Sequence, residues 1–326
     1  MYIREPMPGI PGDPAWPTAA EWLRGDYGEQ PASAPHIGVI GVPLSQSSAP
    51  PAAQHMTPAL FRQHLERFAC FGAGVGITDP RSVYLSEEVR ASDLGTLEIG
   101  HLHNVPAQEK IKTEFTELAA RGVPDLLFCI GGDDAVMRPV LTGLHEDPGR
   151  IGLMMLDSHH DVRLGYRNQG PHNGAAVRFM IEEDGLLGSN VVQIGIAPFG
   201  NSPVYRRYCD EHGFTIVEAG PARREGFAAC VARHLDQLAE RVDTIIVDID
   251  VDVLDAGYGP ASPGARPGQI APWELHEACN VIGAHPAVST LIVVEVDKTM
   301  DLFGTGLDNA CVCFLQAACG LAVRPR

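Results

Sequence analysis

Apolar residues in this chain gather in short, mostly consecutive runs of four to six positions. Runs of that length are typical of strands buried on both faces, as in parallel sheets. The runs that we interpret as strands are Ile37–Val42, Leu126–Ile130, Gly152–Leu156, Val191–Ile196, Thr244–Val247 and Leu291–Val296.

Between these runs, apolar residues recur at three- and four-residue spacing, which predicts helices. The segments are Gln108–Arg121, Ala135–Leu144, Ala176–Glu183, Tyr205–His212, Phe227–Ala239, Pro272–Ile282 and Asn309–Leu321. Regular alternation of strand and helix predicts an α/β fold, a three-layer αβα sandwich with a mainly parallel central sheet. Ligands of such sheets bind outside the carboxyl ends of the strands.

The pattern of strand and helix segments divides the chain into an N-terminal arm and one domain. Residues 1–35 are rich in Pro, Gly and Ala and contain one short helical segment, Thr18–Arg24, so we predict an N-terminal arm. Thr18 and Glu21 have the spacing of a capping box at its start. No second series, linker or repeat follows, and residues 36–326 are predicted to form a single domain. In an oligomer, such an arm would pack on a neighbouring subunit.

The charge and composition of the chain argue against several classes of binding partner and indicate where the protein is located. The formal net charge of −17 argues against nucleic acid and anionic membranes, which need a basic face. The chain lacks an apolar stretch of about 18 residues, and its first residues do not resemble a signal peptide, so we expect a cytoplasmic protein. Eight cysteines are scattered singly, without zinc-site spacing, and are interpreted as reduced thiols.

The first chemical motif follows the run that ends at Leu156. It reads Asp-Ser-His-His-Asp from Asp157 to Asp161. If the strand continues, side chains alternate, and Asp157, His159 and Asp161 project to one side.

The second motif places Asp248, Asp250 and Asp252 at two-residue spacing among Ile and Val. Buried carboxylates brought together without cations would repel one another. One such strand alone could hold Ca²⁺ or Mg²⁺ at a loop edge, and a histidine triplet alone could be a hydrogen-bonded core cluster. Because both motifs lie at strand ends of an α/β chain, together they favour a site for two divalent ions. Mn²⁺ suits these ligands best, with Ni²⁺, Fe²⁺ or Mg²⁺ as alternatives.

These strings resemble the aspartate-histidine-aspartate and aspartate-x-aspartate motifs of the arginase, agmatinase and formimidoylglutamase (ureohydrolase) family. Two more blocks agree with that resemblance. Ile130–Asp134 is similar to the family's glycine-glycine-aspartate-histidine motif, and Val294–Asp297 is similar to its glutamate-valine-asparagine motif. The resemblance spans roughly residues 36 to 322.

The resemblance implies a role for each matching residue. Asp157 and Asp250 would bridge two metals, Asp161 would bind the first metal and hold the bridging hydroxide, and His159 and Asp252 would complete the second. The implied enzyme is a binuclear-metal hydrolase that cleaves a C–N bond of a linear amidine or guanidine.

Catalysis would also need groups for the substrate. Glu295 would sit in the pocket and pair with the amidinium or guanidinium group. An acidic group must protonate the leaving nitrogen.

Two positions depart from the family. Asp134 stands where arginases and agmatinases have a metal-binding histidine, and we expect it to ligate the first metal. Asn173 stands where guanidine-cleaving members have a proton-shuttling histidine. His172, one residue earlier, is a candidate replacement for that shuttle, with an ordinary surface histidine as the alternative.

Formimidoylglutamases also lack the histidine before the glycine, and the neighbourhood of Arg163 and Asn173 looks more like that branch. Asn173 and the arginines Arg163, Arg178 and Arg266 are therefore expected to bind substrate, the arginines through a carboxylate. The product could be formamide or urea.

Alternatives from other classes remain. A non-catalytic or regulatory subunit is the main one, and a carboxylate-metal phosphatase is disfavoured by the lack of a glycine-rich phosphate loop. The resemblance further implies a homo-oligomer, a trimer or hexamer, with a hetero-oligomer with a paralogue as the alternative.

Overall fold

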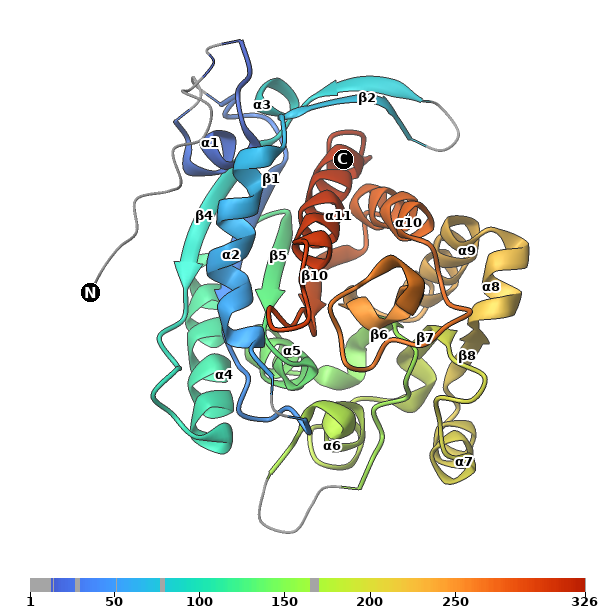
Figure 1. Ribbon diagram of the computed structural model, residues 1–326. Coiled ribbons are helices and arrows are strands. Elements are labelled where there is room, and N and C mark those ends of the chain that lie inside the picture. Colours follow the sequence, from blue (N-terminus) through green and yellow to red (C-terminus); the bar gives the residue numbers. More distant parts are fainter. Residues whose placement is uncertain are drawn as a thin grey trace.

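The computed structural model describes residues 13, 15–26, 30–50, 52–76, 80–164 and 170–325. Its centre is a sheet in the order β4-β1-β5-β10-β9-β6-β7-β8, in which all neighbouring strands are parallel (Figure 1). The strands are β1 (His36–Val42), β4 (Arg90–Thr96), β5 (Leu126–Gly131), β6 (Ile151–Leu156), β7 (Val191–Ile196), β8 (Thr215–Glu218), β9 (Thr244–Asp250) and β10 (Val288–Val294). All six predicted strands are present.

Helices cover both faces of the sheet because its strands are apolar on both sides. In β9, Ile245 and Val247 belong to one core layer and Ile246 to the other. The first layer also holds residues of α1 (Ala19–Arg24), α2 (Thr57–His64), α8 (Ala219–Glu225), α9 (Phe227–Ala239), α10 (Pro272–Ala284) and α11 (Thr305–Leu321). The second holds residues of α4 (Asn104–Arg121), α5 (Met137–Leu144), α6 (Ala176–Glu182) and α7 (Pro203–Glu211). The three-layer αβα prediction is confirmed.

Several elements escaped prediction because their sequences lack an apolar period. The edge strand β4 has one buried residue, Ala91, and the edge strand β8 has none. β2 (Phe71–Val75) and β3 (Arg81–Tyr84) form a separate antiparallel pair, followed by the short helix α3 (Leu85–Glu88). Edge strands face solvent along one side, so burial imposes little pattern on them.

The described part of the predicted arm packs on the chain itself. The side chain of Trp22 in α1 is fully buried, and its indole nitrogen donates to the Val89 carbonyl at 3.1 Å. The predicted capping box of Thr18 and Glu21 is present. Residues 1–12 of the arm lie outside the described residues, and the boundary at residue 35 stays a prediction.

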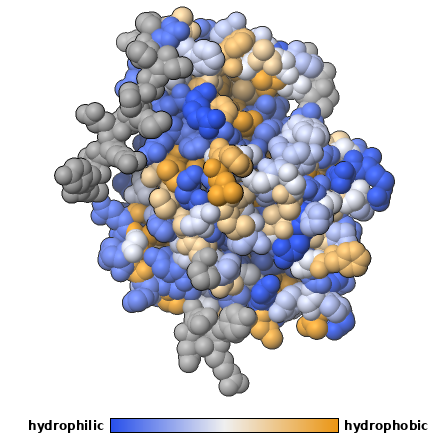
Figure 2. Space-filling view, viewed as in Figure 1, coloured by the Kyte–Doolittle hydropathy of each residue, from blue (hydrophilic) through white to orange (hydrophobic). Residues whose placement is uncertain are grey.

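Three features of the molecule bear on the expectations from composition, namely surface hydropathy, membrane-spanning helices and disulfides. Hydrophilic and apolar side chains are interspersed on the face seen in Figure 2. Among the described residues, none of the helices combines the length and apolar character needed to cross a bilayer. The eight cysteines form no disulfide, in agreement with the interpretation as thiols, and all eight are buried.

Candidate metal centre

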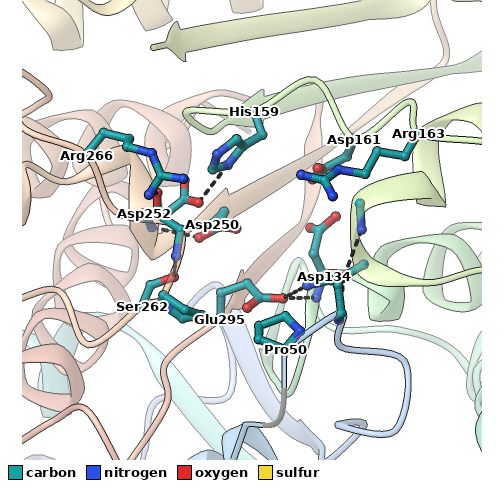
Figure 3. A pocket seen from close by; sticks show the side chains of 15 residues that line it. Pro50, Asp134, His159, Asp161, Arg163, Asp250, Asp252, Ser262, Arg266 and Glu295 are labelled. Carbon is teal, nitrogen blue, oxygen red and sulfur yellow. Dashed lines mark hydrogen bonds and ion pairs between the residues drawn. The ribbon is translucent and has the colours of Figure 1, made fainter. Parts of the chain in front are cut away.

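A cavity of about 200 Å³ opens at the carboxyl ends of the central strands, where α/β sheets bind ligands. Figure 3 shows acidic side chains in its interior and two arginines reaching in from opposite sides. The lining residues are Ala49, Pro50, Asp134, His159, Asp161, Arg163, Asn173, Gly174, Asp250, Asp252, Ser262, Pro263, Gly264, Arg266 and Glu295.

The first motif does not continue the strand, which corrects the expectation of simple alternation. β6 ends at Leu156, and Asp161 has a φ of 46°, in the left-handed region. The turn nevertheless brings His159 and Asp161 to the cavity. His160 points away, as predicted, and its Nδ1 lies 2.7 Å from the side-chain oxygen of Gln193.

Asp157, His159 and Asp252 form one compact group, the His159 subsite. One potential ligand atom from each lies within 4.8 Å of the others. The Nδ1 of His159 is 2.8 Å from Oδ2 of Asp252, and the backbone N–H of His159 donates to Asp157 at 2.6 Å. Burial opposes the charge on both partners, but their mutual attraction raises the pKa of His159 and lowers the pKa of Asp252.

The second motif also leaves the strand, a further correction. β9 ends at Asp250, and Val251–Val253 form a 3₁₀ turn that the Asp250 side chain caps by accepting the Asp252 N–H at 2.7 Å. Gly264 lies so close that a Cβ there would be 2.0 Å from Oδ2 of Asp252. The loop after the metal motif thus packs directly on a candidate ligand.

Asp134, Asp161 and Asp248 are three acids whose negative charges act on one another, and we call them the Asp134 subsite. Figure 3 shows the carboxylates of Asp134 and Asp161 pointing toward one another. Burial, and then the negative charges of Asp248 and Asp161, raise the pKa of Asp134 well above its usual range. Asp248 was part of the predicted acidic cluster but was given no role of its own.

Glu295 is held by three donors at the cavity wall. Its Oε1 accepts from the Asp134 backbone N–H and from the Asn173 side chain, and its Oε2 accepts from the Gln54 side chain, each at 3.0 Å. Burial, and then the charge of Asp133, raise the pKa of Glu295 to about 8. Gln54 was missed by the sequence analysis, because its separation of 241 residues from Glu295 carries no local signal.

The predicted arginines separate into two kinds. Arg163 and Arg266 are exposed and line the cavity. Arg178 does not line it, because its guanidinium stacks 3.8 Å from the ring centroid of Tyr208 and pairs with Glu182 at 2.8 Å. Its predicted contact with substrate has no support in this placement.

His172 is buried and is likewise absent from the cavity lining, whereas its neighbour Asn173 is part of it. The alternative of an ordinary surface histidine is therefore wrong. The structure does not place His172 where a proton shuttle would meet a substrate, and that role stays a prediction.

The residues present fit a pair of divalent cations. Asp134 and Asp248 have both carboxylate oxygens buried without a hydrogen-bond partner among the described residues, and Asp157 has one. Burial first, and then neighbouring carboxylates, raise the pKa of Asp157 and Asp250. Buried anions in this number need compensating positive charge.

The sequence of this chain is similar to those of known proteins. The model of the arginase family matches residues 35–313. The chain belongs to the arginase family. This confirms the predicted family, and with it a metal-dependent hydrolase acting on C–N bonds of linear amidines.

Individual relatives of this arginase-family chain point to one branch. It is 29% identical over 287 residues to the formimidoylglutamase of Bacillus subtilis, covering 88% of each chain, and 29% identical over 265 residues to that of Halalkalibacterium halodurans, covering 81% of each. The crystal structure of the B. subtilis enzyme matches with a TM-score of 0.85 at 26% identity, covering 100% of this chain and 98% of that one. A Trypanosoma cruzi formiminoglutamase solved with Mn²⁺ has the same fold, with a TM-score of 0.79 at 22% identity over 95% of this chain and 100% of the other.

Proposed function

We propose that this chain hydrolyses a linear amidine that also carries a carboxylate, as an N-formimidoyl amino acid does, and releases formamide. The observation that carries the proposal is the polarity of the cavity. Its interior is lined by Asp134, Asp161, Asp250 and Asp252, while the exposed side chains of Arg163 and Arg266 reach in from opposite sides. A substrate with a cation at one end and an anion at the other complements this arrangement.

Glu295 is the partner proposed for the amidinium end. Its three hydrogen bonds fix the carboxylate at the wall, so that it does not have to be ordered when substrate binds. An incoming cation favours the ionised form of Glu295, although burial and the charge of Asp133 raise its pKa to about 8.

Arg163 and Arg266 are the partners proposed for the carboxylate end. Guanidinium groups bind carboxylates through paired hydrogen bonds and remain charged at all relevant pH values. Arg163 passes directly over Gly174, where a Cβ would be 2.8 Å from its Cδ. The glycine after Asn173 therefore leaves room for this arginine.

The metal centre would be held by the His159 subsite, which includes Asp157, by the Asp134 subsite and by Asp250, which lies in the same cavity. Two divalent ions bound there, of which we propose Mn²⁺, would supply an acidified water as the nucleophile for the trigonal amidine carbon. Asp161 lines the cavity beside these ligands and is the residue proposed to orient that water and to carry its proton to the departing nitrogen.

Two alternatives remain as outcomes of the test. A guanidino acid would give urea instead of formamide, and a regulatory subunit would give neither. Each relative named above is an enzyme, and none supports the regulatory alternative.

The deciding experiment incubates the Mn²⁺-loaded chain with N-formimidoyl amino acids, guanidino acids and their decarboxylated analogues, and measures formamide and urea. We expect formamide from the carboxylated formimidoyl compounds. Arg163→Gln and Arg266→Gln should raise KM for these by about tenfold or more and leave the slow turnover of the decarboxylated analogues unchanged. Turnover of no amidine by a chain that holds two metals would contradict the proposal.

We also propose that the enzyme acts in the cytoplasm as a homo-oligomer, a trimer or hexamer, with a paralogue as an alternative partner. The family membership and the absence of a membrane-spanning helix among the described residues support this setting. Light scattering of the purified chain measures the assembly directly, and a monomeric mass would contradict it.

A further inference from the structure

Asp248 is a buried carboxylate that the proposed reaction does not use. It lies in the middle of β9, in register with Met155 of β6 on one side and Ile292 of β10 on the other, and it has no exposed surface. These apolar neighbours offer no hydrogen-bond donor from their side chains. An ionised carboxylate in such surroundings is strongly disfavoured unless a positive charge compensates it.

The group that Asp248 does meet is another acid. Its carboxyl lies within hydrogen-bonding range of Asp134, and neither oxygen of either residue has a donor among the described residues. Ionised carboxylates can only accept hydrogen bonds, so two acids in contact need either a shared proton or a cation between them. Among the basic residues that line the cavity, His159 is paired with Asp252, and Arg163 and Arg266 are exposed side chains.

The family motif explains why a second acid is found here. A histidine at position 134 would reach further into the cavity than aspartate does. A cation bound to the shorter Asp134 would lie deeper, and Asp248 is the acid that contacts Asp134 on the side of the sheet.

We infer that Asp248 is a ligand of the first metal ion, which it holds together with Asp134 and Asp161 through carboxylate oxygens alone. The inference rests on the proposed function only in taking the cavity as a metal site. Oxygen-only shells suit Mn²⁺ and Mg²⁺, whereas imidazole raises the affinity for Ni²⁺ and Zn²⁺. The Asp134 subsite should consequently favour Ni²⁺ and Zn²⁺ less than the His159 subsite does.

The test compares metal binding by the full chain and by Asp248→Asn, which keeps the shape and removes the charge. Mn²⁺ is titrated by calorimetry, bound metal is counted by elemental analysis, and the coupled two-ion signal is followed by electron paramagnetic resonance. We expect two ions in the parental chain. In Asp248→Asn, one ion should stay at parental affinity and the second should bind more than about tenfold more weakly.

Asp301→Asn is the matched control. Asp301 is also buried, but its carboxylate accepts hydrogen bonds from the N–H groups of Gly306 and Leu307, whereas the Asp248 carboxylate has no donor among the described residues. The control variant should bind two ions as the parental chain does. Parental affinity for both ions in Asp248→Asn would overturn the inference.

Two further measurements keep the result decisive. If Asp248→Asn does not fold, Asp248→Ser replaces it, and a parental chain that binds a single Mn²⁺ at saturation overturns the inference without any variant. Asp134→His should raise the affinity for Zn²⁺ relative to Mn²⁺ by about tenfold at one subsite, and an unchanged ratio would also contradict an oxygen-only shell. None of these readouts uses turnover, so a chain that binds two ions but hydrolyses no amidine would overturn the proposed function alone.

Discussion

The two subsites of the candidate metal centre differ in whether the protein itself provides hydrogen-bond partners for the ligands. In the His159 subsite the protein supplies hydrogen-bond partners to each ligand, because Asp252 accepts from Ser158 and lies 2.8 Å from His159, and one oxygen of Asp157 accepts the His159 N–H. In the Asp134 subsite, Asp134 and Asp248 lack donors among the described residues. The first subsite is organised by hydrogen bonds before any ion arrives, whereas the second depends on the ion.

Metal removal should give the largest effect. Burial and mutual repulsion raise the folded-state pKa of Asp134, Asp157, Asp248 and Asp250 above the ordinary aspartate value. A raised pKa means that the stability these groups contribute is fully present below the ordinary value of about 3.9 and is lost as pH rises through the folded-state value. Metal-free protein should therefore lose stability as pH rises, while bound cations keep the carboxylates ionised and compensated.

The measurement is the melting temperature of chelator-treated and metal-loaded protein between about pH 5 and pH 8. The gap between the two should widen as pH rises, and amidine hydrolysis should disappear on chelation and return with Mn²⁺. A gap that stays constant or narrows would show that the Asp134 subsite does not depend on a cation.

The sequence predicted the central strands and some of the site residues, but not how the chain brings those residues together. The central strands were predictable because strands that are buried on both faces consist of consecutive apolar residues. The edge strand β4 has one buried residue, Ala91, and its sequence contains no apolar run. The motifs correctly placed His159 and Asp252 at one site. The expected reason, alternation along a strand, was wrong, because turns after Leu156 and Asp250 bring these side chains together.

The sequence could not predict the roles of residues whose positions depend on loop conformation or on contacts between distant segments. Arg163 and Arg178 have the same chemistry, and only the fold shows that one enters the cavity while the other stacks on Tyr208. Likewise, the contact between Asp134 and Asp248 joins the end of β5 to the middle of β9. No spacing along the chain reports such a contact.

Gly264→Ala should have the next largest effect, confined to the His159 subsite. The added methyl would meet Oδ2 of Asp252 at 2.0 Å, so either the ligand or the loop must move. We expect one ion to bind about a hundredfold more weakly and the ion at the Asp134 subsite to be retained, as counted by elemental analysis.

Gly100→Ala is the matched control, since a Cβ there meets nothing within 4 Å. Loss of both ions in Gly264→Ala would mean that the two subsites fill as one unit, and the comparison between them would not hold.

The smallest effect is expected from Ser158→Ala. The hydroxyl of Ser158 donates to Oδ1 of Asp252 at 2.7 Å, but the Ser158 backbone N–H donates to the same oxygen at 3.2 Å and remains in the variant. The ligand should keep its orientation, and metal affinity should fall by up to about tenfold, at the low end for a residue that supports a ligand. The serine also lowers the pKa of Asp252, so its loss should shift the pH at which the His159 subsite takes up metal upward. Titration of Mn²⁺ binding against pH measures that shift. An unchanged midpoint would show that His159 and the Ser158 backbone N–H suffice to keep Asp252 ionised, and that the serine hydroxyl orients the ligand without tuning its charge.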